Sequence, residues 1–138
     1  MARTPNSAAL MLALATLLIW PFGGGKQERL TPTAQAPGSA GIATINRDRN
    51  GNTIIKLEVK YLAPATMLHP PQVCYVVWAQ PTGRPPENKG VLRAGGNREA
   101  DLTFPVPYST FLLFITAESN PLVTEPSEQI ALSGQITP

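Results

Sequence analysis

Chemically reactive side chains are scarce in this sequence of 138 residues, which contains one cysteine and one histidine. The single cysteine, Cys74, excludes a disulfide bond within the chain. Zinc requires three or four His, Cys or acidic ligands, so His69 alone predicts no metal site. No glycine-rich loop lies between a predicted strand and a helix, as nucleotide binding would require. The sequence therefore predicts neither a bound metal nor a cofactor.

Charge is also sparse. Asp, Glu, Lys and Arg make up 14% of the chain, and 11 basic residues are scattered among 9 acidic ones. Nucleic-acid binding requires clustered Lys and Arg together with exposed aromatic residues. The absence of any basic run predicts that nucleic acid is not a partner.

One unbroken apolar run is present, AALMLALATLLIW at residues 8–20. It follows a short segment that carries Arg3 and no acid, and Pro21 and the small residues 23–25 come after it. This order is typical of a secretory signal peptide. We therefore expect residues 1–25 to direct export to the periplasm or the extracellular space, with cleavage after Gly25 or, as a second choice, after Ala36.

A membrane anchor is the alternative interpretation of residues 8–20. A membrane-spanning helix requires about 20 apolar residues, more than this run provides. If the segment nevertheless stays uncleaved, the chain is anchored in the inner membrane, and only then is the membrane a partner.

The rest of the chain has the composition of one small domain. Residues 26–39 are rich in Pro, Gly, Thr, Gln and Ala, which predicts a disordered linker. Residues 40–138 then form the folded domain. The whole chain contains 15 prolines and 11 glycines. In the folded domain they separate short apolar segments that have no helical periodicity.

Seven segments have the pattern of β-strands, which predicts an all-β, seven-stranded antiparallel sandwich of immunoglobulin-like size. Asn50-Gly51 predicts a tight hairpin turn. After it, alternation places Ile55, Leu57, Val59 and Tyr61 on one buried face. The expected strands are residues 41–48, 53–62, 73–80, 89–94, 100–106, 109–118 and 128–136.

Two of these strands, residues 73–80 and 109–118, are apolar on both faces and should be central. We expect Val76, Trp78, Leu113 and Ile115 to be buried. Cys74 lies in the first of these strands and is predicted to be an unreactive core residue. In the closing strand, Ile130 and Leu132 are expected to point inward.

The order of these elements resembles the extracytoplasmic domain of anti-sigma-K-type factors. The matching features are the Asn-Gly turn, TIIKLEVKYL ending at Leu62-Ala63-Pro64, CYVVWAQP, NKGVLRAG, the Thr-Ala-Glu at 116–118 and the closing Leu-Ser-Gly at 132–134. The resemblance implies a β domain on the outer side of a membrane. Only seven residues precede the apolar run, so a sigma-binding part is not expected, and the resemblance does not imply sigma inhibition.

The exposed loops carry the candidate interaction residues, because recognition on β scaffolds uses connecting segments. They are His69, Arg84, Glu87, Lys89 and Tyr108. The sequence favours an exported, non-enzymatic domain that binds an envelope protein or a polysaccharide. The alternatives are a membrane-anchored sensor or regulatory domain, and a small hydrolase that uses Glu118, Glu125 and Glu128 at one end of the domain.

Overall fold

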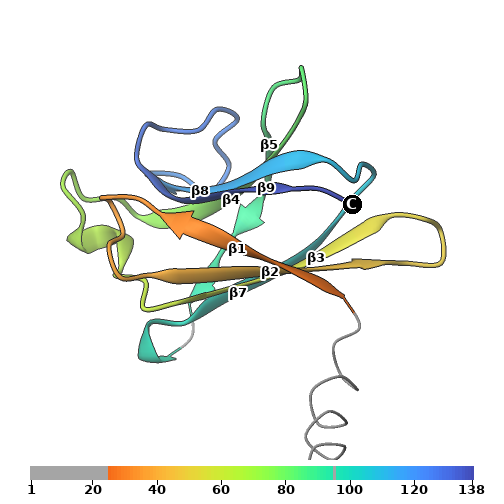
Figure 1. Ribbon diagram of the computed structural model, residues 1–138. Coiled ribbons are helices and arrows are strands. Elements are labelled where there is room, and N and C mark those ends of the chain that lie inside the picture. The colour runs from red at the N-terminus through yellow and green to blue at the C-terminus, as the bar shows by residue number, and fades with distance from the viewer. Residues whose placement is uncertain (1–24, 95) are drawn as a thin grey trace, which may run out of the picture.

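A computed structural model describes residues 25–94 and 96–138, and the expected export segment at residues 8–20 lies outside this part. The protein is all-β, with two short 3-10 turns (Figure 1). The elements in chain order are β1 (Lys26–Pro32), β2 (Ala40–Arg47), β3 (Thr53–Lys60), η1 (Ala65–Met67), β4 (Cys74–Pro81), β5 (Glu87–Val91), β6 (Arg93–Ala94), η2 (Gly96–Arg98), β7 (Ala100–Val106), β8 (Phe111–Glu118) and β9 (Ile130–Ile136).

All nine strands belong to one antiparallel sheet in the order β5-β4-β8-β9-β1-β2-β3-β7-β6. The sheet folds so that its β4–β8–β9 half faces its β2–β3–β7 half, with the core between them (Figure 1). Because β5 and β6 follow one another directly in the chain, the two edges of the sheet lie beside each other and nearly close it. The prediction of an all-β fold is confirmed, but the seven-stranded sandwich is wrong: the molecule is barrel-like.

Strand β1 joins the two halves of the sheet. Its first five residues pair with β2, and Thr31 and Pro32 pair with β9. The predicted disordered linker at residues 26–39 is therefore wrong over β1, and the folded part begins before Ala40. Leu30 is the one side chain of this strand that is fully buried, so the segment has too little apolar pattern to be recognised as a strand.

The second connection between the halves is the segment from β5 to β6. Residues 89–94 were expected to form one strand, but β5 pairs with β4 whereas β6 pairs with β7. Gly90 has φ 126°, and the side chain of Leu102 lies 3.5 Å from the position that a Cβ on Gly90 would occupy. A side chain at this bend would be strained. Glycine at position 90 therefore allows the chain to cross from the β4–β8–β9 half of the sheet to the β2–β3–β7 half.

The local predictions for the hairpin are confirmed. β2 and β3 pair in register from Arg47 and Thr53 onward, and Gly51 provides the positive φ of 83°. Ile55, Leu57 and Val59 are buried, but Tyr61 is not, because β3 ends at Lys60 and Tyr61 itself has φ 59°.

The central strands β4 and β8 are covered on both faces, as predicted. Val76, Trp78, Leu113 and Ile115 have no exposed surface. Val76 and Trp78 face outward, where they form a second apolar cluster with Phe114, and Val123 of the loop at residues 119–127 packs on it. The indole N–H of Trp78 donates to Oγ1 of Thr116 at 2.8 Å, which satisfies the one polar atom of the ring.

The closing strand differs from its prediction. The register between β8 and β9 shifts between Ile115 and Thr116. As a result Ala131 and Leu132 are both buried, whereas Ile130 is 37% exposed and does not point into the core.

Candidate functional site

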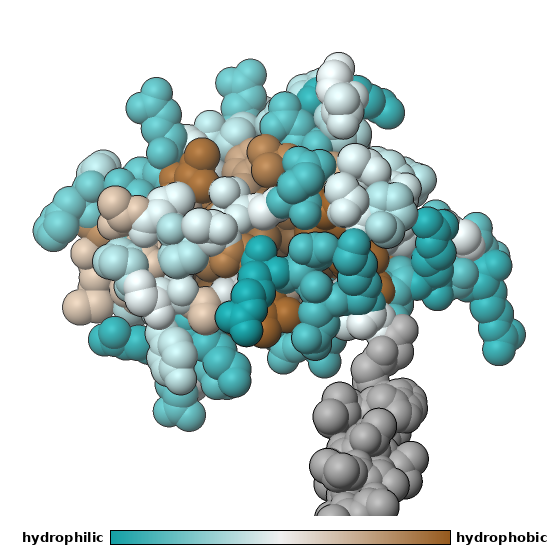
Figure 2. Space-filling model, viewed as in Figure 1, coloured by the Kyte–Doolittle hydropathy of each residue, from teal (hydrophilic) through white to brown (hydrophobic). Residues whose placement is uncertain are grey.

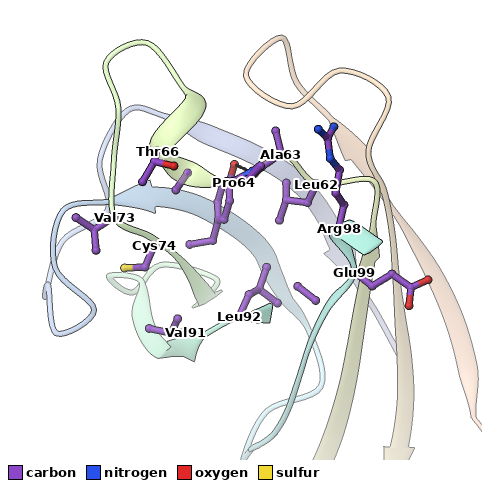
Figure 3. Close-up of a pocket in the computed structure, with 13 residues that line it drawn as sticks. Leu62, Ala63, Pro64, Thr66, Val73, Cys74, Val91, Leu92, Arg98 and Glu99 are labelled. Carbon is purple, nitrogen blue, oxygen red and sulfur yellow. Dashed lines mark hydrogen bonds between the residues drawn. The ribbon is translucent and has the colours of Figure 1, made fainter. Parts of the chain in front are cut away.

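A surface pocket of about 440 Å³ opens at the end of the barrel where β4 begins (Figure 3). Most of the groups that line it are apolar. The lining residues are Leu62, Ala63, Pro64, Ala65, Thr66, Val73, Cys74, Tyr75, Val91, Leu92, Arg98, Glu99 and Ala100. We call this end of the barrel, with the loops at residues 61–73, 96–99 and 119–129, the pocket end.

Three segments far apart in the chain are fixed around the pocket by hydrogen bonds. Tyr75 is buried in β4, and its hydroxyl donates to the carbonyl of Ala63 at 2.7 Å. The N–H of Leu92 donates to the carbonyl of Tyr75 at 3.0 Å. Tyr75 therefore holds both the loop after β3 and the bend between β5 and β6, and burial raises the pKa of its hydroxyl.

Three non-glycine residues beside the pocket have left-handed backbone conformations. They are Tyr61 with φ 59°, Asn97 with φ 63° and Arg98 with φ 59°. The two strained turns contact each other, since the N–H of Leu62 donates to the carbonyl of Arg98 at 3.1 Å. Such conformations cost free energy and are concentrated at binding and active sites. This geometry marks the pocket rim as the candidate functional site.

Exposed apolar side chains occur in the pocket lining and next to it in the chain. Val73 lines the pocket and is 67% exposed, whereas Tyr61 and Met67, 67% and 62% exposed, are chain neighbours of the lining residues Leu62 and Thr66. Large apolar side chains gathered at one place on a soluble surface are typical of interaction sites.

Cys74 lies at the wall of the pocket and is only partly buried, which corrects the prediction that it is a core residue. Its Sγ lies 3.7 Å from the carbonyl oxygen of Glu118. Burial and then the charge of Glu118 raise the pKa of the thiol. Because the thiolate is the nucleophilic form, this environment disfavours covalent catalysis.

The candidate loop residues divide between the two ends of the barrel. His69 is exposed in the loop after η1, at the pocket end. Glu87 lies at the start of β5, where its carboxylate accepts from the Tyr108 hydroxyl at 2.7 Å and pairs with Lys89 at 3.1 Å. Hydrogen bonds from Tyr108 and then Lys89 lower the pKa of Glu87, while burial and the bond to Glu87 raise that of Tyr108. The positive charge of Arg84 acts to lower the pKa of both Glu87 and Tyr108.

Glu87, Lys89 and Tyr108 form what we call the Glu87 cluster. It connects β5 with the segment after β7, across the seam where the two edges of the sheet meet. Its residues were selected from the sequence as separate exposed contacts. Their polar groups bond mainly to one another, so the cluster closes the seam and leaves few groups available to a ligand.

The three glutamates of the hydrolase alternative have different environments. Glu118 is buried, and its carboxylate accepts hydrogen bonds from the Thr116 hydroxyl and from the N–H of Ser127 at 2.7 Å. Glu125 and Glu128 are exposed. Over residues 25–94 and 96–138, no group of three His, Cys, Asp or Glu could hold a metal ion. Because its carboxylate accepts from the N–H of Ser127, Glu118 anchors the loop at residues 119–127.

Searches of family models, curated proteins and solved structures found no match to this chain. In the described part of the chain, neither of the short helical turns has the length and apolar character needed to span a bilayer.

Proposed function

We propose that the chain is an exported, non-enzymatic binding domain of the bacterial envelope, similar in role to the extracytoplasmic domains of anti-sigma-K-type factors. The proposal depends chiefly on one observation, the apolar pocket of about 440 Å³, with Val73 exposed in its lining and Met67 and Tyr61 exposed next to lining residues in the chain. Export is supported by the apolar run at residues 8–20 and the small residues that follow it.

Binding is favoured over catalysis by the state of the polar groups near the pocket. The Tyr75 hydroxyl is bonded to Ala63, the Glu118 carboxylate is bonded to Thr116 and Ser127, and the Cys74 thiol is held protonated. A general base must reach the proton that it abstracts, and these groups are already occupied.

A protein segment fits the pocket better than a polysaccharide. Sugar sites combine stacked aromatic rings with many free polar groups, whereas the aromatic wall residue here, Tyr75, is buried and its hydroxyl is used. We therefore assign the pocket to an apolar side chain of a partner protein, with Arg98 and Glu99 at the rim as polar contacts.

Site-specific photocrosslinking in the envelope tests this function. A photoreactive residue at Val73 should give one discrete crosslinked protein, and Met67→Glu should remove it. A photoreactive residue at Thr103, which is exposed on β7, is the matched control and should give none. Equal crosslinking from both positions would contradict the proposal, as would a full-length species confined to the cytosol.

A further inference from the structure

The end of the barrel opposite the pocket has a different chemical character. We call it the entry end, because the chain enters the domain here at Gly25. It comprises the β2–β3 turn, residues 107–110, and the chain end at Thr137 and Pro138. Gly25, Arg47 and Pro138 line one shallow pocket of about 370 Å³, which shows that these segments lie together.

Apolar side chains avoid the entry end. Among the described residues, five large hydrophobic side chains are exposed. Tyr61, Met67, Val73 and Leu122 lie in the loops of the pocket end, and Ile130 begins β9 directly after the last of these loops. Figure 2 shows hydrophilic side chains over the β2–β3 hairpin, at the right of the view. An exposed surface of this kind fits water or a charged partner.

Arginine dominates the tip of this end. Arg47 is the last residue of β2, Arg49 lies in the turn that follows, and both are exposed. The acid between them, Asp48, is directed into the turn, where its carboxylate accepts from the N–H groups of Asn50 and Asn52, each at 2.9 Å. Glu28 is paired with Lys26 at 3.2 Å. Within the β2–β3 turn, the guanidinium groups of Arg47 and Arg49 are therefore the available charges.

The pocket end is mixed in charge, with the exposed acids Glu99, Glu125 and Glu128 beside the exposed bases Lys60, Arg93 and Arg98. Strands of up to eight residues separate the two ends by about 26 Å. An anionic surface would therefore attract the entry end more strongly than the pocket end.

The sequence before Gly25 supplies such a surface. Gly25 is five residues after Trp20, the last residue of the apolar run, so it can lie at most about 17 Å from it. We propose that, in the uncleaved form of the chain, in which residues 8–20 stay in the membrane, the entry end docks on anionic headgroups through Arg47 and Arg49, and that the pocket points away from the bilayer.

The arginines act as an orienting contact, and the apolar run acts as the tether. A basic residue close to an anionic leaflet increases the membrane-binding constant by about fivefold, so two such residues increase it by about 25-fold. The effect decays within a Debye length, about 8 Å at physiological salt. The hairpin must therefore lie against the headgroups.

Amide hydrogen exchange on the full chain tests the orientation. The chain is reconstituted in vesicles of phosphatidylcholine with 30% phosphatidylglycerol or of phosphatidylcholine alone. In the anionic vesicles, exchange at residues 46–52 should slow by roughly tenfold, and 0.5 M NaCl should reverse the effect. Residues 61–73 at the pocket end should exchange equally in both.

Matched variants separate charge from tethering. Arg47→Gln/Arg49→Gln should remove the slowing, whereas Arg47→Lys/Arg49→Lys should keep most of it. Lys60→Gln/Arg93→Gln removes the same charge near the pocket end and should leave the slowing intact. Equal protection in both vesicle types, protection at residues 61–73, or protection that survives Arg47→Gln/Arg49→Gln would overturn the inference. Crosslinking at Val73 is independent of these outcomes.

Discussion

The two ends of the barrel form their turns in different ways. At the entry end, Gly51 takes the positive φ of 83°, a conformation that glycine adopts without strain. At the pocket end, Tyr61, Asn97 and Arg98 take comparable conformations with full side chains. Glycine would be more stable at these three positions. The comparison indicates that the entry end is built for a regular hairpin, whereas the pocket end keeps side chains at a cost in stability.

The largest expected difference between the ends concerns their tyrosines. Tyr75→Ala should destabilise the protein by about 3–4 kcal/mol, because a buried ring and its bond to Ala63 are lost. Tyr108→Ala at the entry end should cost only about 1–2 kcal/mol, since this ring is partly exposed. Urea denaturation measures both. Equal losses in the free energy of unfolding would show that Tyr75 at the pocket wall contributes no more to stability than Tyr108.

Glu118 provides the next test of the pocket end. Glu118→Ala should cost about 2 kcal/mol, because Thr116 and Ser127 lose a charged acceptor that is buried in the folded protein. Glu125→Ala removes an exposed carboxylate of the neighbouring loop and should change stability by less than about 0.5 kcal/mol. Thermal unfolding distinguishes the two, and a neutral Glu118→Ala would show that the loop is held by other contacts.

Backbone strain gives a prediction of opposite sign. Arg98→Gly should stabilise the protein by about 0.5–1 kcal/mol, because the relief of a positive φ exceeds the added freedom of the unfolded chain. Arg93→Gly in β6 should destabilise it by a similar amount, about 0.5–1 kcal/mol, since glycine weakens a strand. Denaturant midpoints decide between them. Destabilisation by both variants would mean that the rim is not strained.

Cys74 reports on the accessibility of the pocket. Its raised pKa leaves little thiolate at pH 8, so a thiol reagent should label the folded protein roughly tenfold more slowly than a peptide cysteine. Labelling should accelerate in denaturant and with rising pH. Mass spectrometry follows the reaction. A native rate equal to that of the unfolded chain would show that the pocket wall opens readily.

The smallest effect belongs to the Glu87 cluster. The pKa of Glu87 should lie below its ordinary value, so its contribution to stability is present above the unfolded pKa and is lost as the pH falls through the folded pKa. In Tyr108→Phe, which lacks the hydroxyl donor, the pKa should return toward the ordinary value. Carboxyl chemical shifts measured by NMR against pH give both values, and an unchanged pKa in Tyr108→Phe would assign the shift to Lys89.

Features set by neighbouring residues could be predicted from the sequence. The Asn50-Gly51 turn and the alternation of Ile55, Leu57 and Val59 are local patterns, and the structure has both. The two-sided apolar pattern around Trp78 also predicted its burial correctly. In each case the physical cause lies within a few residues.

Closure of the sheet and formation of the pocket depend on residues far apart in the chain. β1 carries a single fully buried side chain, Leu30, so its role as a shared strand follows only from its pairing with β2 and β9. The positive φ of Tyr61 and Arg98 could not be expected, because these residue types rarely adopt it. The one available signal was the loop at residues 61–72, which holds more apolar residues than a loop exposed to water requires.

The position of β1 has a mechanical consequence. A pull on the chain before Gly25 is transmitted directly into β1, which is hydrogen-bonded to β2 along its first part and to β9 at its end. A force directed along the strand loads these bonds in shear and all at once, whereas a force across it would unzip them singly. Because Lys26 also bonds to the carbonyls of Thr137 and Pro138, the last residues of the chain are joined to the same element. The domain is thus built to resist extension by a force applied to the chain before Gly25.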